Sequence, residues 1–439
     1  MVVRKSQLAT KVPHGADTVD GGSRSQAARA TIAVISDYAL DYTGGAQTAM
    51  VAECRSLVQA GISVLLVVPD SSTTLPLDGI DVRLLPAPRL PIVGLPVIRN
   101  TKRTRSLLEA IFRDEGVGAV HVHSDFGLAV AAIDVAARLS IPSIATVHTF
   151  FWRGVPGPVG HLLAPLAAAY FAGVTGRRPR QGRAGRDRLG DLLRDVTRST
   201  AARADLVISP SQHQAEALRR AGLPRVEVLP NTVLPRVQVA GDFEHSYAGA
   251  EAGAEGGGPL RLLWIGRCAP EKRLLPFIEA CLLVLDRDRE AIRVEVIGTG
   301  PSLARAVRLA AGSTAITFRG FVENSRVGGV IRESDLVVLT SFGFDNQPMV
   351  IVEALREGRG VVYVDPDLEE GLDGPGLLAP VEPAAFAAYL EGLCSDRALV
   401  RDAAAAAREA FAPFTPAAHA ASVLALHATA RSHLADRDR

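Results

Sequence analysis

Several features that mark particular classes of protein are missing from this chain of 439 residues. Positive and negative charges nearly balance, with 48 Lys and Arg against 47 Asp and Glu, so no overall field directs the chain to nucleic acid. Cysteines are few and far apart, without CxxC or Cys/His ligand spacing, at Cys54, Cys268, Cys281 and Cys394. Neither a zinc site nor a disulfide framework is therefore expected, and a reducing, cytoplasmic location is the simplest.

Long uninterrupted apolar runs are missing as well. Residues 1–30 mix Gly, Ser, Lys, His and Asp without the apolar core of a secretion signal, so we expect a disordered segment. The most apolar long stretch, residues 155–174, is interrupted by Pro156, Pro158 and Pro165. It falls short of a membrane span, although attachment to a membrane surface stays open.

What the chain does contain is an alternation of short β-branched runs with segments of helical periodicity. The first such unit has an expected strand at 31–36, a loop that ends in Gly44 and Gly45, and a helix at 46–60. Later units repeat this order on both sides of residues 241–258, which are rich in Gly, Ala and Glu. The alternation predicts an α/β protein with a doubly wound parallel sheet in each half, and the stretch between them predicts a flexible linker.

The expected division of the chain follows from this alternation. It comprises a disordered segment at 1–30, a first α/β domain at 31–236 with a basic insert at about 154–200, a linker at 237–259, a second α/β domain at 260–412, and a segment at 413–439 whose helix crosses back to the first domain. Further strands are expected at 62–68, 81–85, 119–123, 143–147, 205–209, 226–229, 260–265, 294–297, 316–318, 336–339 and 360–364. Further helices are expected at 102–114, 126–139, 274–285, 302–309, 327–334, 350–356, 384–391, 399–411 and 417–433. Two similar halves of this kind predict a ligand cleft between them.

Charged side chains follow two of the strands expected in the second domain. Arg267 closely follows one strand, with Lys272 five residues later, and Asp345 comes after another strand, with Glu353 eight positions later. Ligands of parallel sheets collect at the carboxyl ends of the strands. Because Arg and Lys bind phosphate oxygens and carboxylates accept hydrogen bonds from hydroxyls, this layout favours a diphosphate attached to a sugar.

These charged residues also have purely structural explanations. Arg267 and Lys272 would fit a solvated loop that also contains Glu271 and Arg273. Glu353 would fit the first turn of a helix, where the helix dipole stabilises a carboxylate.

A metal ion or cofactor is not expected to take part in the chemistry. No DxD motif, the kind that binds a diphosphate through a metal ion, falls at a suitable strand end; Asp365 and Asp367 flank Pro366, where a turn is needed. His121 and His123 share one face of a strand, but neither a third ligand nor a helical spacing accompanies them. A metal pair is therefore not expected there, and the site is expected to be metal-independent.

A series of short motifs then carries a family resemblance. In chain order they are TGGAQ at 43–47, VHVHSDFGLA at 120–129, VHTF at 147–150, LPN at 229–231, IGRCAPEK at 265–272, IGTGP at 297–301, FRGFV at 318–322 and FDNQPMVIVEAL at 344–355. The ordered series resembles glycosyltransferase family 4, whose members are retaining nucleotide-sugar enzymes with the GT-B fold. This resemblance implies two Rossmann-like doubly wound domains that face each other across a cleft. Residues 31–236 would bind the acceptor, and residues 260–412 would bind the nucleotide-sugar, a UDP- or GDP-hexose.

The resemblance also implies roles for individual side chains. Arg267 and Lys272 correspond to the pair that neutralises the leaving diphosphate, and no side chain acts as nucleophile. Asp345 and His148 correspond to residues that contact the donor sugar, and Glu353 to the residue that orients the ribose. Asp345 stands where the family usually has Glu, so this chain carries Asp-x7-Glu in place of Glu-x7-Glu. Which donor sugar fits is therefore open.

Backbone groups of the donor site are implied at glycines and at two further amides. These positions are Gly44, Gly45, Gly266, Gly298, Gly300, Gly320, Asn346 and Gln347. Gly44 and Gly45 precede an expected helix, whose N-terminus suits an anion, although a plain strand-to-helix turn is the alternative. Gly298 and Gly300 resemble the start of GxGxxG, but the third glycine is absent, so this is a weak dinucleotide signature.

The acceptor is indicated by the first domain. HSDFGLA at 123–129, followed by VHTFFW at 147–152, resembles the branch of the family that glycosylates diacylglycerol and other lipids, with a glycan as the other class of acceptor. Acceptor contacts are expected from His123, Asp125, Phe151 and Trp152.

A basic segment follows these aromatic residues. Its arginines are Arg177, Arg178, Arg180, Arg183, Arg186 and Arg188. Such a segment suits an anionic membrane surface and would place the protein peripherally on the inner face of the cell membrane. A charged, disordered loop that only keeps the chain soluble is the alternative, because Gly and Pro interrupt any amphipathic helix.

Four other functions stay open from the residues alone. A nucleotide-sugar epimerase or a glycosyl phosphorylase on the same plan would need a catalytic acid or a cofactor lysine, and no residue stands out for either role. A non-catalytic module that senses sugar nucleotides is opposed by the joint presence of Arg267, Lys272 and Glu353. A NAD-dependent oxidoreductase would need the missing third glycine and an acidic residue at the end of the second strand.

Overall fold

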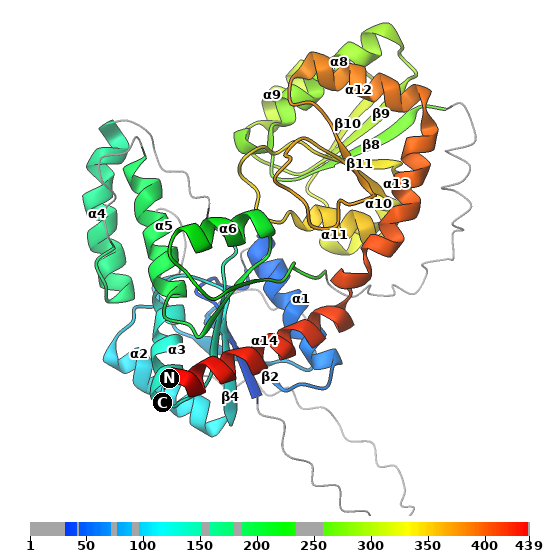
Figure 1. The fold of residues 1–439 in the computed structure, drawn as a ribbon. Coiled ribbons are helices and arrows are strands. Elements are labelled where there is room, and N and C mark those ends of the chain that lie inside the picture. The colour runs from blue at the N-terminus through cyan, green and yellow to red at the C-terminus, as the bar shows by residue number, and fades with distance from the viewer. Residues whose placement is uncertain are drawn as a thin grey trace, which may run out of the picture. The chain divides into compact units, whose positions relative to one another are not determined.

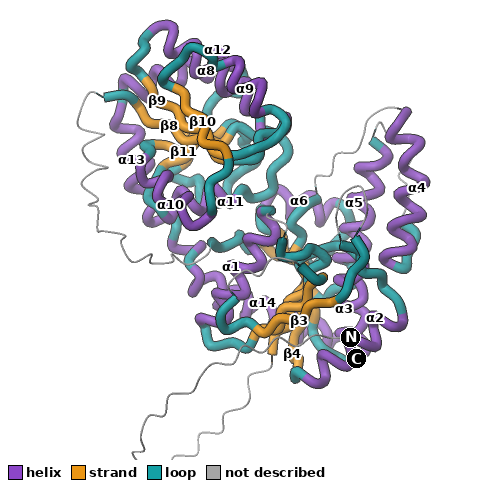
Figure 2. The backbone as a smooth tube through the Cα atoms, turned by 180° about the vertical axis from the view of Figure 1, so that it is seen from behind, coloured by secondary structure: helices purple, strands orange, loops and turns teal. Residues whose placement is uncertain are grey.

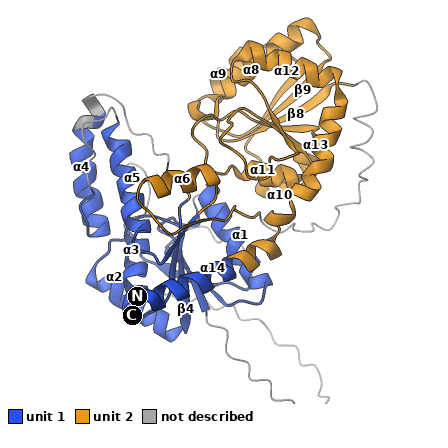
Figure 3. Ribbon diagram, viewed as in Figure 1, with its two compact units in different colours: residues 1–147, 152–208, 423–439 blue, residues 148–151, 209–422 orange. Residues whose placement is uncertain are grey.

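The computed structural model describes residues 31–41, 44–71, 77–89, 96–150, 158–179, 187–233 and 258–437. The chain forms two compact units (Figure 3). Unit 1 contains residues 1–147, 152–208 and 423–439, and unit 2 contains residues 148–151 and 209–422. The segment expected to be disordered, residues 1–30, and all but the last two residues of the expected linker at 237–259 lie outside the described residues.

The first sheet has seven strands in the order β3-β2-β1-β4-β5-β6-β7. These strands are β1 Thr31–Ile35, β2 Val64–Pro69, β3 Asp81–Leu85, β4 Val117–Val122, β5 Ser143–Thr146, β6 Leu206–Ser209 and β7 Val226–Val228. Helices alternate with these strands (Figures 1 and 2): α1 Gly45–Gln59, α2 Lys102–Asp114, α3 Gly127–Arg138, α4 Pro158–Thr175, α5 Arg188–Ala201 and α6 Gln212–Arg220. Of these, α4 stands beside α5, away from the strands. Every residue of β2 is buried, as expected for a parallel strand that helices cover on both faces.

The second sheet has six strands in the order β10-β9-β8-β11-β12-β13, and its described pairs are parallel. The strands are β8 Leu260–Ile265, β9 Ile292–Ile297, β10 Ile316–Gly320, β11 Leu336–Leu339, β12 Gly360–Tyr363 and β13 Gly376–Leu378. The helical segments are η1 Pro270–Lys272, α8 Leu274–Arg287, α9 Leu303–Leu309, α10 Asn324–Glu333, α11 Met349–Arg356, α12 Pro383–Ser395, α13 Arg397–Ala410 and η2 Ala412–Phe414. The final helix is α14 Pro416–Arg437.

Alternate residues of β8 face two separate hydrophobic cores. Leu262 and Trp264 pack with residues of α8 and α12 on one face, whereas Leu263 packs with residues of α10 and α11 on the other. This follows from the period of two along a strand. A strand buried on both faces is rigid, so it fixes the positions of the loops that leave its carboxyl end.

One buried carboxylate connects the first strand of unit 1 to helix α3. Asp37, directly beyond β1, accepts hydrogen bonds from the backbone amides of Leu128 (2.7 Å), Phe126 (3.2 Å) and Ala129 (3.2 Å). These amides have no partner within the helix, so Asp37 supplies the cap that the helix lacks locally.

The C-terminal part of α14 belongs to unit 1. Arg431 donates a hydrogen bond to the carbonyl oxygen of Gly118 (3.1 Å), and His433 Nδ1 lies 3.2 Å from the carbonyl oxygen of Asp205. Among the described helices, none has both the length and the apolar character needed to cross a bilayer.

The predicted pair of doubly wound parallel sheets is confirmed, whereas some details of the expected elements are not. Helices α5 and α6 and strand β13 were not expected. The division at residue 236 also differs, because residues 209–233 group with unit 2. There, Asn231 N donates to Gln347 Oε1 (2.7 Å) and Thr232 Oγ1 donates to the carbonyl oxygen of Phe414 (2.7 Å).

Candidate functional site

Three loops at the carboxyl edge of the second sheet interlock through backbone hydrogen bonds. Gly266 N donates to the carbonyl of Ile297 (3.1 Å), Cys268 N to that of Thr299 (2.8 Å), and Gly298 N to that of Gly320 (2.8 Å). The approach is so close that a Cβ at Gly298 would lie 1.8 Å from Gly266 O.

Gly298 and Gly300 are two of the glycines assigned to the donor site. The packing of these loops is by itself a reason for glycine at both positions. Both have positive φ, at 135° and 150°, and a Cβ at Gly300 would lie 2.5 Å from the carbonyl oxygen of Cys268. Gly320 has positive φ as well, at 69°. Unlike the other two, it has no atom within 4 Å of a Cβ built there. Only the first two glycines are required by the packing of the loops.

An ion pair links the loop after β8 to the loop after β11. Lys272 Nζ lies 2.5 Å from Asp345 Oδ1, and the two side chains are only 21% and 9% exposed. Thr340 reinforces this link, because its hydroxyl donates to the carbonyl of Lys272 (2.7 Å) and accepts from the indole nitrogen of Trp264 (2.9 Å). The structure thus brings together two residues that the sequence placed in one site.

Arg267 occupies the same loop but points into solvent. Its side chain is 63% exposed and forms an ion pair with Glu271. This pairing matches the solvated-loop explanation for Arg267, whereas Lys272 is partly buried and paired across the sheet edge. An exposed guanidinium on a loop keeps the freedom to turn toward an anion.

Asn346 and Gln347 hold other segments of unit 2 in place. Asn346 Oδ1 accepts a hydrogen bond from the hydroxyl of Ser211, and its Nδ2 donates to the carbonyl of His148 at 3.4 Å. Gln347 Oε1 accepts from the amide of Asn231. The side chains of the two residues thus make structural contacts, and the backbone of His148 lies next to the loop after β11.

Buried polar atoms without a hydrogen-bond partner gather on the loop after β11. Within the described part of the chain, Ser341 Oγ, Asp345 Oδ2 and Gln347 Nε2 have none. An unpaired buried polar group costs about 1–3 kcal/mol, so such groups are rare unless a ligand or water satisfies them. Ser341 was not singled out from the sequence, although its place two residues after β11 was a usable signal.

Glu353 lies further along α11 than expected. The helix begins at Met349 and has no acidic residue in its first turn, so the explanation of Glu353 as a first-turn carboxylate is wrong. Burial raises the pKa of Glu353, and the nearby Arg356 only partly offsets that rise. A partly buried carboxylate with a raised pKa is a candidate for binding a ligand.

Asp365 has a positioning role that the sequence did not reveal. It is 3% exposed; its Oδ2 accepts from Gly343 N (2.7 Å) and its Oδ1 from Asp367 N (3.2 Å). The second bond forms the expected turn. The first fixes the backbone two residues before Asp345, so Asp365 holds the loop that presents the paired carboxylate.

In unit 1, the glycine loop leads into α1 as expected. Gly44 is the N-cap residue of α1 and has an extended backbone conformation. No side chain caps this end of the helix, and Gly45 is exposed. The first-turn amides of α1 are therefore open to an anion.

His123 and Asp125, assigned to the acceptor, are buried inside unit 1. His123 is 3% exposed, with its Nε2 3.1 Å from Glu53 Oε1. Asp125 is 8% exposed; its side chain accepts from the Thr197 hydroxyl (2.8 Å) and its carbonyl from the Thr200 hydroxyl (2.8 Å). The expectation that this pair reaches a cleft is not supported by these contacts, because α5 covers Asp125. Burial raises the pKa of Asp125 to about 7, despite the Thr197 hydrogen bond.

The expectation that no third metal-ligand side chain accompanies His121 and His123 is also wrong. Glu53 of α1 places a carboxylate oxygen 2.8 Å from His121 Nδ1. His427 of α14 lies beside them, its ring centroid 5.5 Å from that of His121. Burial lowers the pKa of His427 to about 3, so this ring is neutral.

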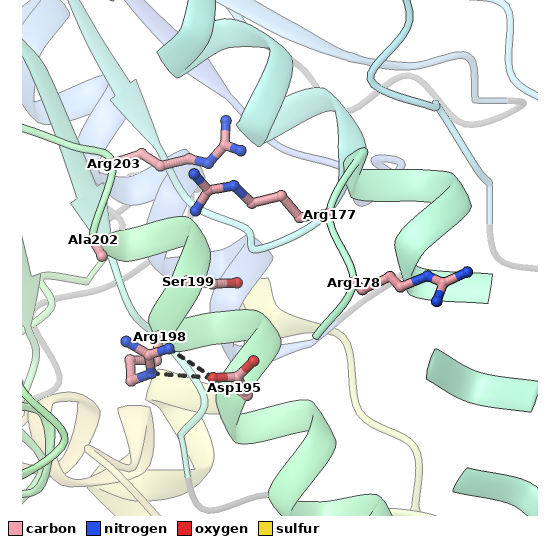
Figure 4. Close-up of a pocket in the computed structure, with 7 residues that line it drawn as sticks. All are labelled: Arg177, Arg178, Asp195, Arg198, Ser199, Ala202 and Arg203. Carbon is pink, nitrogen blue, oxygen red and sulfur yellow. Dashed lines mark hydrogen bonds and ion pairs between the residues drawn. The ribbon is translucent and has the colours of Figure 1, made fainter. Parts of the chain in front are cut away.

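Part of the basic insert forms a pocket of about 300 Å³ in unit 1 (Figure 4). Its lining consists of Arg177, Arg178, Asp195, Arg198, Ser199, Ala202 and Arg203. Arg198 is paired with Asp195 (Figure 4), and Arg203 is paired with Asp134. The pocket carries more positive than negative charge, as an anion-binding surface requires. Phe151, Trp152, Arg180, Arg183 and Arg186 lie outside the described residues.

Two family models match this chain, one in each half. Residues 43–235 match the family model of Glycosyltransferase Family 4, and residues 259–396 match that of Glycosyl transferases group 1. No protein with a curated description matches the sequence.

Solved structures share the fold along nearly the full length. HepE of Anabaena, solved with UDP, is 17% identical with a TM-score of 0.63, covering 91% of this chain and 100% of that one. Sucrose-phosphate synthase from Thermosynechococcus elongatus is 18% identical with a TM-score of 0.62, covering 91% and 99%. The pneumococcal O-GlcNAc transferase GtfA, solved with UDP and GlcNAc, is 11% identical with a TM-score of 0.59, covering 92% and 99%. The fold is therefore the GT-B fold.

Proposed function

This chain belongs to glycosyltransferase family 4, and from that premise we propose that it is a retaining hexosyltransferase that takes a UDP-hexose as donor and a membrane-lipid hydroxyl as acceptor. UDP is preferred to GDP because two proteins with a similar fold, HepE and GtfA, were solved with UDP. Diacylglycerol is the lipid to which the motifs in the first half point.

The pairing of Lys272 with Asp345 is the observation that carries the proposal. It holds the ammonium group of Lys272 at the carboxyl edge of the sheet. In the proposed complex, Lys272 and Arg267 bind the diphosphate oxygens and stabilise the negative charge that develops on them as the sugar departs. Arg267 would leave Glu271 and turn toward the diphosphate.

The unpartnered polar atoms on the loop after β11 fit the sugar. Asp345 Oδ2 and Ser341 Oγ would accept hydrogen bonds from sugar hydroxyls, and Gln347 Nε2 would donate one. The imidazole of His148, carried by the neighbouring segment, would contact the same sugar. Glu353 would accept hydrogen bonds from the ribose hydroxyls, which would stabilise its ionised form against the effect of burial.

The reaction exchanges one bond at the anomeric carbon. The acceptor oxygen forms a bond to that carbon on the face from which the UDP oxygen leaves, so the configuration is retained. The departing β-phosphate oxygen takes the proton of the acceptor hydroxyl, and no enzyme nucleophile takes part. Because Lys272 and Arg267 supply the positive charge, we expect transfer without added divalent metal ions.

Two features of the insert support an acceptor in the membrane. Helix α4 exposes Leu162 (75%), Leu163 (39%) and Leu166 (67%), and the arginine-lined pocket begins just after its C-terminal end. Exposed leucines beside arginines suit the boundary between headgroups and acyl chains of an anionic bilayer. We place the protein peripherally on the cytoplasmic face of the membrane.

The function is tested by supplying labelled UDP-glucose, UDP-galactose and UDP-GlcNAc to the full chain with vesicles that contain diacylglycerol. We expect a glycolipid from one donor, with the anomeric proton coupling of the retained configuration. Inversion would contradict the mechanism, and transfer only to soluble glycans would contradict the lipid acceptor. Donor binding without any transfer would identify the chain as a sugar-nucleotide sensor.

Membrane attachment is tested by vesicle co-sedimentation of the double variant Arg177→Glu/Arg178→Glu. Neither guanidinium has a carboxylate partner within the described part of the chain, so folding should be unaffected. We expect binding to anionic vesicles to fall at least about tenfold, since each basic residue near the surface contributes about 1 kcal/mol. Arg305→Glu/Arg308→Glu, on the exposed face of α9, is the matched control and should bind as wild type. Equal loss of vesicle binding in both variants would show that the binding depends on net charge alone and not on Arg177 and Arg178.

A further inference from the structure

Three ligand-type side chains converge in the interior of unit 1. Glu53 of α1 and His121 and His123 of β4 each offer one ligand atom, and these atoms all lie within 4.8 Å of one another. Glu53 Oε1 is 2.8 Å from His121 Nδ1 and 3.1 Å from His123 Nε2, and all three side chains are at most 5% exposed. The two imidazoles share one face of β4, with ring centroids 4.4 Å apart.

The second nitrogen of His121 is already engaged. His121 Nε2 lies 2.7 Å from the hydroxyl of Thr146, on the adjacent strand β5. In the tautomer that donates this proton to Thr146, Nδ1 carries a lone pair toward the carboxylate of Glu53. In spite of the short separation, Nδ1 makes no hydrogen bond among the described residues. A lone pair that faces a carboxylate oxygen is repelled unless a cation lies between them, and metal-bound histidines usually donate their other nitrogen to an oxygen in this way.

His427 adds an independent observation. This residue of α14 is 7% exposed, and its ring meets the ring of His121 edge-on, at 82°. Neither of its nitrogens has a hydrogen-bond partner in the described part of the chain. Buried imidazoles normally have partners, because leaving such a group unsatisfied costs about 1–3 kcal/mol. A buried imidazole without hydrogen-bond partners, beside two further imidazoles, has the character of an unused metal ligand.

We propose that Glu53, His121 and His123 bind a structural divalent transition-metal ion, with Zn²⁺ as the best fit and His427 as the fourth ligand. Imidazole and carboxylate are ligands that Zn²⁺ accepts in tetrahedral geometry. Bond lengths of about 2.0–2.2 Å place tetrahedral ligand atoms about 3.3 Å apart, so the two spacings from Glu53 to the histidines, 2.8 and 3.1 Å, need widen by only a few tenths of an ångström. Four protein ligands leave no open position for a substrate, which assigns the ion to stability and not to catalysis.

The ion would join three segments that are distant in the chain. Glu53 comes from α1, the two histidines of the pair from β4, and His427 from α14, within the C-terminal part that belongs to unit 1. Metal binding to a folded site adds its free energy to folding. This site goes beyond the proposed transfer reaction and does not depend on it.

The test is the metal content of the full-length, untagged protein, measured by mass spectrometry after growth with zinc. We expect about one Zn²⁺ per chain, and Co²⁺ exchanged into the site should give the visible bands of a tetrahedral complex. Removal of the ion from the wild type by a strong chelator should lower its unfolding temperature. Wild type with no bound metal and no response to zinc would overturn the site and leave a cluster that shares a proton.

Variants then assign the ligands. Glu53→Gln and His123→Gln should each lower the metal content to below about a tenth of an equivalent, and His427→Gln should weaken Co²⁺ binding at least about tenfold. His433→Gln is the matched control, because His433 lies on the same helix but contacts the carbonyl of Asp205. Circular dichroism establishes that each variant folds. Full metal content in folded Glu53→Gln and His123→Gln would place the metal elsewhere and overturn the assignment.

Discussion

Lys272 and Asp345 meet across the carboxyl edge of the second sheet, with 2.5 Å between Nζ and Oδ1. The two residues are far apart in the sequence and come from the loops after β8 and β11. Their contact fixes the ammonium group at the place that we propose for the diphosphate, and hydrogen bonds from Thr340 and to Asp365 hold the two loops.

The first prediction concerns Asp345 in this pair. Asp345→Asn removes the charge that orients Lys272, so kcat/KM with UDP-hexose should fall about 100-fold, the usual effect of displacing a positioning group by about 1 Å. Asp345→Glu keeps the charge and should retain most of the activity. Steady-state kinetics measure both, with Asp286→Asn, at an exposed position of α8, as the control. Equal activity in Asp345→Asn and wild type would show that the pair has no part in donor turnover.

The second prediction sets stability against binding at Glu353. Burial raises its pKa, so the stability that its neutral form contributes is complete below the ordinary pKa of a free glutamate and is lost as pH rises through the folded value. Glu353→Gln should therefore unfold at a higher temperature than wild type at about pH 8, with the difference gone at about pH 4. Its affinity for UDP should fall about tenfold, because the charge-assisted hydrogen bonds to ribose are lost. A variant that loses stability at about pH 8 would refute this explanation of Glu353.

A third prediction separates two glycines that the sequence treats alike. Gly298→Ala should abolish folding or lower the unfolding temperature sharply, because its Cβ would lie 1.8 Å from Gly266 O. Gly320→Ala meets no atom within 4 Å and should cost only the strain of positive φ, about 1–2 kcal/mol. Urea unfolding of both variants measures the difference. Equal destabilisation would mean that the loops relax freely around Gly298.

A fourth prediction uses the buried carboxylate of Asp125. Burial raises its pKa to about 7, and the charge of Asp37 adds to the rise. The stability of the neutral form is present below about pH 4 and is lost as pH rises through about 7. Asp125→Asn keeps an oxygen for the Thr197 hydroxyl, so it should have a higher urea midpoint than wild type at about pH 8 and the same midpoint at about pH 4. A constant difference across this range would contradict the raised pKa.

The local sequence pattern was sufficient for most of the fold. Strands β3, β8 and β11 and helix α2 have the bounds expected from apolar runs and helical periodicity. Helix α5 was missed because its buried residues, such as Leu192 and Val196, are dispersed within an arginine-rich stretch. Strand β13 has only three residues and no distinct pattern.

Site residues were predictable where they follow the end of a strand. They were not predictable where their contacts depend on packing between elements that are distant in the sequence. Lys272 and Asp345 were identifiable because each follows a parallel strand. The contact of Glu53 with His121 was not, since it depends on how α1 lies against β4. Glu353 was placed wrongly in its helix because Pro348 and Met349, not Glu353, define where α11 begins.

Calorimetric titration of UDP tests the central claim most directly, by comparing wild type with Arg267→Ala and Lys272→Ala. Arg287→Ala, an exposed arginine of α8 paired with Glu391, is the matched control. We predict that UDP binds the wild type and the control alike, and that each of the other two variants binds at least about tenfold more weakly, as the loss of charged hydrogen bonds requires. Unchanged UDP affinity in both variants, or no binding to the wild type, would contradict the assignment of this edge of the second sheet as the donor site.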